Sequence, residues 1–158
     1  MVHKSRIGTI VIDCQTNDVD DAARFWSAAL GRPARALTDA ADANYRSLEG
    51  PPEEVAILVQ AVDHASRAHI DIETDDIEAE VRRLEALGAT RVAKIKRWWV
   101  MQAPTGQRFC VVRPQRPDFD ARAKAWEDED AGSSSASKQS RWSGVGIEPS
   151  DTLTAEKP

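Results

Sequence analysis

Hydrophobic and polar positions follow the same order twice along this chain. In residues 7–14 apolar side chains alternate with polar ones, which is the period of a half-buried strand. An acidic turn follows, then apolar residues at helical spacing over residues 22–30, and Gly31 is a suitable helix stop. Residues 69–88 repeat this series of strand, acidic cap, helix and Leu-Gly. The chain therefore contains two copies of one supersecondary unit.

Three further strands are expected after each helix. They fall at residues 35–38, 44–48 and 55–62 in the first copy, and at residues 90–95, 98–102 and 108–113 in the second. Each copy thus reads as strand, helix and three strands. This order predicts an α+β fold in which two βαβββ repeats, residues 6–62 and 67–114, form one domain over residues 1–114.

The pattern changes after the last of these strands. Phe119, Ala123 and Trp126 are spaced for a weak apolar face, so residues 115–130 are expected to form a short C-terminal helix, over residues 118–129. Residues 131–158 are rich in serine and poor in apolar side chains. Such a composition does not repay the entropy of ordering, which predicts a polar, flexible tail.

Composition narrows the classes of partner. The net charge of −5 and the pI of about 5.2 argue against a general surface for nucleic acid or for an anionic membrane. No apolar segment approaches the ~20 residues that span a bilayer, and the N-terminus lacks the pattern of a signal peptide. The two cysteines, Cys14 and Cys110, are too few for a disulfide framework. We therefore expect a cytoplasmic protein with reduced thiols.

The doubled unit and several short motifs resemble the vicinal oxygen chelate superfamily, in its glyoxalase-like and bleomycin-resistance branch. The resemblance covers roughly residues 6–114 and leaves the tail unexplained. The Pro-x-Gly turn followed by Phe-Cys-Val-Val is its most distinctive part. The matching residues are Phe25-Trp26 before Ala29-Leu30-Gly31, His69-Ile70-Asp71-Ile72-Glu73, Leu87-Gly88, and Ala103-Pro104-Thr105-Gly106-Gln107-Arg108-Phe109-Cys110.

The resemblance implies that the repeats lie side by side and curl a mixed sheet into a half-open cup that holds a small molecule. Metal-using members of the family place four ligands there, typically His or Gln, Glu, His and Glu. The corresponding residues here are Thr9, Gln60, His69 and Cys110, of which only His69 fits well. Carboxylates usually offset the cost of dehydrating a divalent ion, and both are missing. We therefore expect no metal cofactor, with a divalent metal on His69 as the alternative.

Three ionisable residues alternate along one predicted strand and so share a face. They are His69, Asp71 and Glu73, and the resemblance turns that face toward the cup. One interpretation makes His69 and Glu73 catalytic and Asp71 and Gln60 ligand-binding. The other is an exposed polar face whose charges pair with arginines such as Arg108 or Arg46. Asp13 holds the position in the first repeat that Glu73 holds in the second, and is expected to be an ion-pair or turn residue.

Aromatic and sulfur-containing residues are the remaining ligand-binding candidates. Trp98 and Trp99 are adjacent on a strand, so one packs under a helix and the other faces the cup or solvent. The one that faces the cup would form an aromatic wall for a planar or apolar ligand, and the alternative is that both serve only packing. Tyr45 has the same two interpretations, and Met101 shares a face with Trp99. Cys110 is expected to be a small buried residue at the cup, with a nucleophile as the less favoured role.

Three functions remain open at this point. The first is metal-independent binding of a small organic molecule, as in the drug-resistance branch. The second is a metal-dependent lyase, isomerase or dioxygenase of the glyoxalase type that uses His69. The third is a non-catalytic interaction domain. The resemblance also implies a homodimer, because members of the family often complete their cups between two chains.

Overall fold

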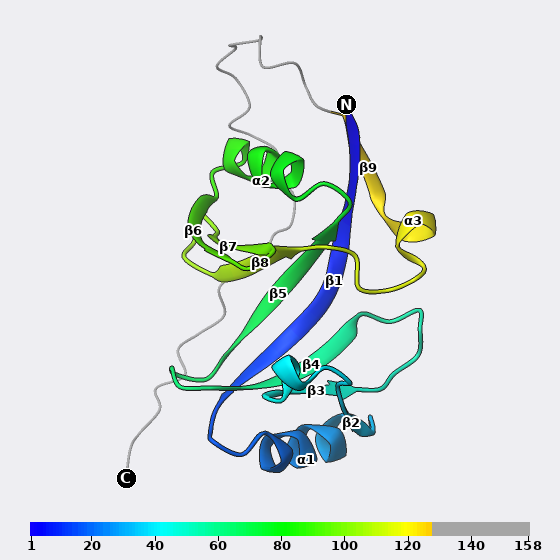
Figure 1. The fold of residues 1–158 in the computed structure, drawn as a ribbon, viewed down its shortest axis with the longest axis vertical. Helices are drawn as coiled ribbons and strands as arrows, with labels where there is room; N and C mark the ends of the chain where they lie inside the picture. Colours follow the sequence, from blue (N-terminus) through cyan, green and yellow to red (C-terminus); the bar gives the residue numbers. More distant parts are fainter. Residues whose placement is uncertain (128–158) are drawn as a thin grey trace, which may run out of the picture. The chain divides into compact units, whose positions relative to one another are not determined.

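The computed structural model describes residues 1–127, and both predicted copies are present in it (Figure 1). The first copy comprises β1 (Val2–Gln15), α1 (Val19–Leu30), β2 (Ala34–Ala36), a 3-10 turn at Ala40–Asp42, β3 (Tyr45–Leu48) and β4 (Ala56–Val62). The second comprises β5 (Arg67–Thr74), α2 (Ile77–Ala86), β6 (Thr90–Ile95), β7 (Trp98–Gln102) and β8 (Arg108–Val112). The predicted α+β fold of two βαβββ repeats is therefore confirmed.

One curved mixed sheet runs through both repeats, in the strand order β2-β3-β4-β1-β5-β8-β7-β6. The two halves have matching connections, because β1 pairs in parallel with β4 just as β5 pairs in parallel with β8. The repeats meet where β1 and β5 run antiparallel in the middle of the sheet. The first strand of each repeat therefore lies at the centre, and side chains from both repeats come together there.

Both long helices cover the same side of the sheet and build two separate cores. Under α1, Leu48 and Val59 are 2% and 0% exposed. Under α2, Val111 is fully buried. Alternation along the strands sends the intervening side chains to the other side, which we call the open face, and Val11 on that face is only 1% exposed. Neither core includes Val11, so the curvature of the sheet itself buries the middle of the open face.

The helix boundaries follow the residues that predicted them. Asp18 caps α1 by accepting hydrogen bonds from the backbone N–H groups of Asp20 and Asp21. Gly31 ends α1 in the left-handed conformation at φ 65°. Asp76 caps α2 by accepting from the N–H of Ala79 at 2.9 Å.

The predicted helix within residues 115–130 is largely wrong. Helix α3 covers only Phe119–Arg122, and β9 (Lys124–Glu127) pairs antiparallel with the start of β1. The physical reason is that β1 begins at Val2, before the predicted strand, which leaves an edge of backbone groups that β9 satisfies. The Trp126 indole N–H also donates to Ser5 Oγ at 2.7 Å. The predicted tail, residues 131–158, lies outside the described residues.

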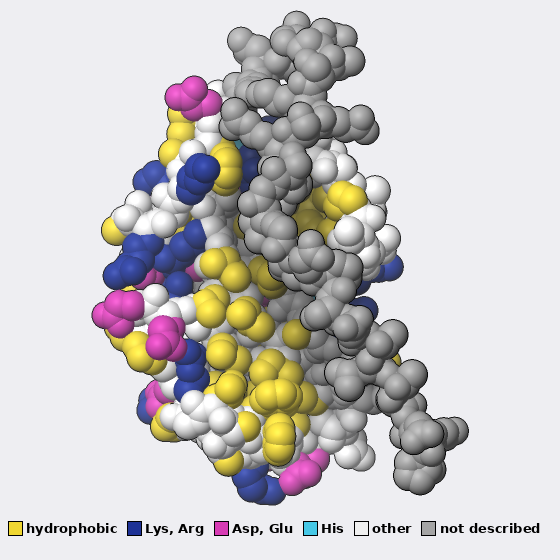
Figure 2. Space-filling view, turned by 180° about the vertical axis from the view of Figure 1, so that it is seen from behind, with side chains coloured by type: hydrophobic (Ala, Val, Ile, Leu, Met, Phe, Trp, Pro, Cys, Tyr) yellow, Lys and Arg dark blue, Asp and Glu magenta, His cyan; other side chains and the backbone are white. Residues whose placement is uncertain are grey.

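Some large hydrophobic side chains remain exposed. Ile7, Phe25 and Ile70 are 46%, 63% and 44% exposed. Figure 2 shows hydrophobic side chains gathered over the middle and lower part of one face of the molecule. Among the described residues, no helix is both long and apolar enough to cross a membrane.

Candidate functional site

The candidate site is built around His69, on the open face of β5. The Nδ1–H group of His69 donates to Oδ2 of Asp13 on β1 at 2.8 Å. Its Nε2 atom lies 3.4 Å from Oδ1 of Asp71. The His69 side chain is 14% exposed and that of Asp13 only 1%. Asp13 therefore orients the ring, as the expected ion pair would, and leaves Nε2 on the side of Asp71.

The two carboxylates decide the charge of His69. Burial alone would lower the pKa of this imidazole, but its interactions with Asp13, Asp71 and Cys110 raise the pKa to about 11. At neutral pH His69 is thus an imidazolium, which donates hydrogen bonds from both nitrogens and does not accept a proton. The expectation that His69 titrates in the range useful for general acid–base work is not met by this environment.

Tyr45 and Gln60 extend the site across the first repeat. Tyr45 on β3 is paired in register with Gln60 on β4, and Gln60 is paired with Asp13, so their side chains share the open face. Burial, reinforced by the negative charges of Asp71 and Asp13, raises the pKa of Tyr45 to about 12. The phenol therefore keeps its proton. Gln60 also borders a surface pocket with Asn44 and Gln15, which gives it access to solvent.

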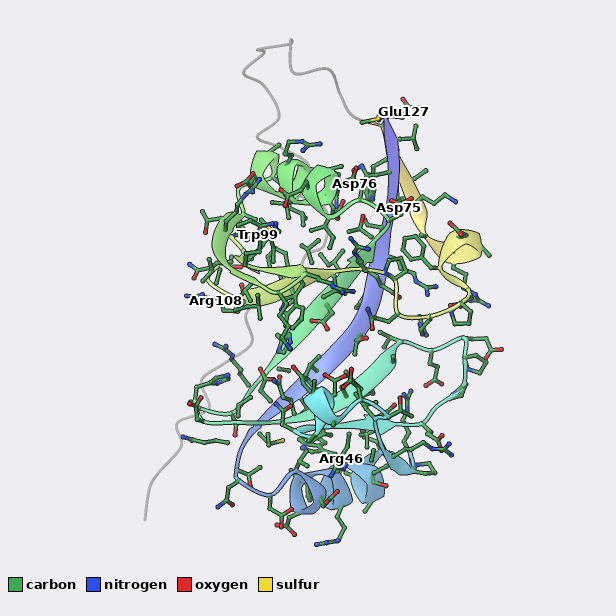
Figure 3. All side chains as sticks on the ribbon, viewed as in Figure 1. Arg46, Asp75, Asp76, Trp99, Arg108 and Glu127 are labelled. Carbon is green, nitrogen blue, oxygen red and sulfur yellow. The ribbon has the colours of Figure 1, made fainter. Side chains whose placement is uncertain are left out.

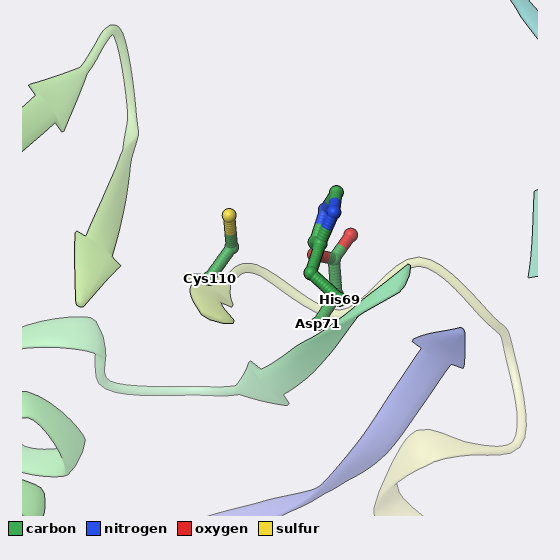
Figure 4. A group of neighbouring side chains, drawn as sticks. All are labelled: His69, Asp71 and Cys110. Atoms are coloured by element: carbon green, nitrogen blue, oxygen red, sulfur yellow. The ribbon is translucent and has the colours of Figure 1, made fainter. Parts of the chain in front are cut away.

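Cys110 completes the site from the second repeat. It lies on β8 directly opposite Asp71 in the register, and it is half-buried. Figure 4 shows its thiol on the same side of the sheet as His69 and Asp71. The ligand-type atoms of these three side chains all lie within 4.8 Å of one another. Tyr45, Gln60, His69, Asp71 and Cys110 are thus the predicted residues that the structure brings together.

These three donors are of kinds that a metal ion accepts. A nitrogen, a carboxylate oxygen and a sulfur suit zinc, and three protein ligands are typical of an open zinc site. The Asp13 carboxylate on Nδ1 of His69 is the outer partner that such ligands usually have. Tetrahedral ligands lie roughly 3.3–3.8 Å apart at ordinary zinc distances, so the donors would have to draw closer. Thr9 and Gln60, the other two positions expected from the resemblance, are not part of this group.

Trp99 and Met101 do not belong to the site. Both point to the helix side of β7, where they contribute to the core under α2, and Met101 is 0% exposed. The Trp99 indole N–H donates to Glu78 Oε1 at 2.9 Å, and Figure 3 shows Trp99 on the α2 side of the fold. Their prediction as ligand-binding residues is therefore wrong, because alternation aims this pair at α2. Trp98 and the adjoining Val100 point the other way and stay on the open face.

Glu73 is also removed from the reactive part of the site. Its side chain is 0% exposed, and it accepts from Arg6 Nε at 3.1 Å and from the backbone N–H of Gln115 at 2.5 Å. Gly8 makes this burial possible, because a Cβ there would lie 2.3 Å from Glu73 Cγ. Glu73 is thus a structural ion-pair residue, and its prediction as a catalytic residue is wrong.

Two partners in these networks were missed by sequence reasoning. Arg6 was not identified as the partner of Glu73, and the suggested Arg46 instead binds Asp20 at the start of α1. Asp13 was expected only as a generic ion pair. The only sequence signal for the importance of Asp13 was its position in the first repeat, which is equivalent to that of Glu73 in the second. The strand register that brings Asp13 next to His69 was not visible in the sequence.

Comparisons with known proteins agree with this fold. Residues 9–112 match the family model described as a glyoxalase-like domain. None of the curated proteins matches the chain.

Solved structures resemble the chain at low identity. Methylmalonyl-CoA epimerase from Mycobacterium tuberculosis is 18% identical, with a TM-score of 0.49 over 73% of this chain and 91% of the epimerase. A variant of the same enzyme from Streptomyces coelicolor, in complex with 2-nitronate-propionyl-CoA, is 16% identical, with a TM-score of 0.48 over 70% and 98%. A Legionella pneumophila protein described as an NAD-dependent benzaldehyde dehydrogenase is 7% identical, with a TM-score of 0.50 over 68% and 98%. At these identities the likeness concerns the fold alone.

Proposed function

This chain belongs to the glyoxalase-like domain family of the vicinal oxygen chelate superfamily, and we propose that it binds a small organic molecule on the open face between its two repeats. One observation supports this most strongly. His69 is held as an imidazolium between Asp13 and Asp71 at the centre of the sheet, although the two hydrophobic cores lie on the opposite side. Ionisable groups whose pKa is strongly shifted by specific charged neighbours are typical of functional sites.

The groups on this face suit a ligand with a polar end. The His69 imidazolium and the Tyr45 phenol donate hydrogen bonds, Asp71 accepts them, and the Gln60 amide does both. A carbonyl or carboxylate would be held by the donors. Trp98, on the open side of β7, offers an apolar surface for the remainder of the molecule. The proposed role of His69 is thus hydrogen-bond donation, with no need for a metal.

Thermal unfolding and titration calorimetry with a panel of small aromatic and aliphatic carboxylic acids test this proposal. A binding compound should raise the melting temperature of the wild type, since it stabilises only the folded state. The variant H69Q should lose that shift. The matched control is H64Q, because His64 is a half-buried histidine in the loop before β5, with its Nδ1 atom 2.9 Å from the backbone oxygen of Ala65. A compound that stabilises H69Q as well as the wild type would remove His69 from the binding site.

A metal-dependent lyase, isomerase or dioxygenase is the second candidate, favoured by the three donor atoms of His69, Asp71 and Cys110. A bound metal would act there as a Lewis acid toward a substrate oxygen. It ranks second because the metal would have to displace a proton that two carboxylates hold on His69. Elemental analysis of untagged protein tests it. Near-stoichiometric metal that is lost in C110S and D71N would support this candidate over the first.

A non-catalytic interaction domain is the third candidate. It predicts that no small molecule stabilises the protein and that H69Q behaves as the wild type in every binding assay. The homodimer and the cytoplasmic location stay predictions. Light scattering coupled to size-exclusion chromatography measures the first of these directly.

A further inference from the structure

The two cysteines of the chain lie in opposite environments. Cys14 is on the helix side of β1, where it packs against the core under α1. Burial raises the pKa of its thiol, which disfavours the reactive thiolate. Cys110 is half-buried as Cys14 is, but it lies on the open face of β8, next to a charged group. The chain therefore carries an internal comparison between a core thiol and a thiol at the candidate site.

Cys110 lies beside a histidine ring that a carboxylate orients, and its thiol is the nucleophile of this group. Its Sγ atom lies within 4.8 Å of a ring nitrogen of His69. Asp13 holds the other side of that ring at 2.8 Å through Nδ1. This is the arrangement by which enzymes orient a ring beside a nucleophile, and distances in unliganded sites are often longer than in the reacting complex.

A second feature of the same site is a buried hydrogen-bond acceptor on Asp13 that has no donor within the described part of the chain. The Oδ1 atom of Asp13 is buried and has no hydrogen-bond partner among the described residues. The side chain of Asp13 is 1% exposed, so bulk water does not compensate for the missing bond. A buried acceptor left open beside the His69 ring is unexplained by packing alone. A polar group of a bound molecule would satisfy it.

The geometry points to Cys110 as a nucleophile that forms a covalent bond with a soft carbon electrophile bound on the open face, such as an activated alkene. This inference rests on the proposed binding site and names the class of ligand. Sγ forms a bond to the alkene carbon β to the activating group, the alkene π pair moves to the neighbouring carbon, and that carbon takes a proton. The proton lost from the thiol balances the proton gained, so no oxidant or reductant is needed. The thiol proton is released to solvent, the His69 imidazolium gives its Nε2 proton to that carbon, and the ring then takes a proton back from solvent.

The rate of alkylation at each cysteine tests this assignment. The full-length protein is treated with N-ethylmaleimide in the presence of a chelator, and peptide mass spectrometry follows Cys110 and Cys14 separately. Glutathione at the same pH gives the rate of an ordinary thiol. We expect Cys110 to react at least about tenfold faster than glutathione, and Cys14 to react more slowly than glutathione. C14S should leave the rate at Cys110 unchanged.

Variants of the surrounding residues show whether the site, and not exposure alone, accelerates the reaction. H69Q should bring the rate at Cys110 down to that of glutathione, and D13N should lower it as well, with folding checked by circular dichroism. A wild-type rate at Cys110 no faster than that of glutathione would overturn the assignment, and so would an unchanged rate in both variants.

Failure of this inference differs from failure of the proposed function. If C110S and the wild type bind the same carboxylic acid equally well while Cys110 reacts no faster than glutathione, only the covalent step is wrong. If neither protein binds any compound of the panel, the proposed site itself is wrong.

Discussion

Replacing Asp13 by asparagine isolates the electrostatic centre of the site. Asp13 accepts the Nδ1–H of His69 at 2.8 Å, and its carboxylate is the first of the groups that raise the pKa of this ring. Two unit charges at 2.8 Å attract by about 6 kcal/mol at an effective dielectric constant of about 20, which corresponds to about four pKa units. Asp71 keeps part of this effect in the variant. We therefore expect D13N to lower the pKa of His69, raised to about 11 in the wild type, by at least about two units.

The sign of the effect on stability follows from the direction of the shift. The pKa of His69 is raised from 6.5 to about 11 on folding, so its contribution to stability is complete below pH 6.5. That contribution is lost as the pH rises toward 11. In D13N the loss should again begin near pH 6.5 but be complete at a lower pH, because only the pKa of the folded state changes. Because the variant breaks a buried ion pair, its free energy of unfolding at pH 7 should fall by about 3 kcal/mol.

Nuclear magnetic resonance titration of the histidine Cε1–H signals measures the pKa directly, and chemical denaturation measures the stability. H69Q identifies the His69 signal, and His64, in the loop before β5, provides a second histidine signal in every sample. The reasoning would be refuted if His69 of the wild type titrated below about pH 8, well inside the usual histidine range. An identical pKa in D13N and the wild type would refute it equally.

Three further substitutions test the roles that the structure assigns outside the binding site. R6M should lower the free energy of unfolding by about 3 to 5 kcal/mol, because it leaves the fully buried Glu73 without its main partner, whereas R24M, at an exposed pair, should unfold as the wild type does in the same urea titration. G8A should lower the melting temperature measured by calorimetry, since the added Cβ would lie 2.3 Å from Glu73 Cγ; unchanged melting would contradict the close approach. M101A should cost about 2 to 5 kcal/mol yet leave ligand affinity intact, and a loss of affinity in folded protein would return Met101 to the site.

Local rules predicted most of the fold because each signal acts within a few residues. Asp18 and Gly31 mark both ends of α1, and alternation located β6 and β7 at the residues where they are found. The prediction for the C-terminal segment was wrong because a long-range contact decides its structure. The spacing of Phe119 and Trp126 is weakly helical, but the free edge of β1, more than a hundred residues earlier in the chain, decides that residues 124–127 form a strand.

The candidate site shows the same division between local and long-range information. The row of ionisable residues on β5 was visible from period-two spacing, and His69 and Asp71 do lie on the open face. The pairing of β5 with β1 decides which charged partner each of these ionisable residues contacts. The bulge at Gly8 shifts that register, so that Glu73 lies opposite Arg6 while Asp71 lies opposite Thr9. No sequence pattern predicts such a shift in register, and for that reason Glu73 was predicted to be a catalytic residue.

Chemical-shift mapping tests the central claim most directly. Amide spectra of isotope-labelled protein would be recorded during titration with a carboxylic acid that raises its melting temperature. The account predicts that the largest shifts fall on Tyr45, Gln60, His69, Asp71 and Cys110, which the four strands β3, β4, β5 and β8 bring to one face. Shifts confined to the helix side of the sheet, or to the loops away from β5, would contradict a binding site on the open face.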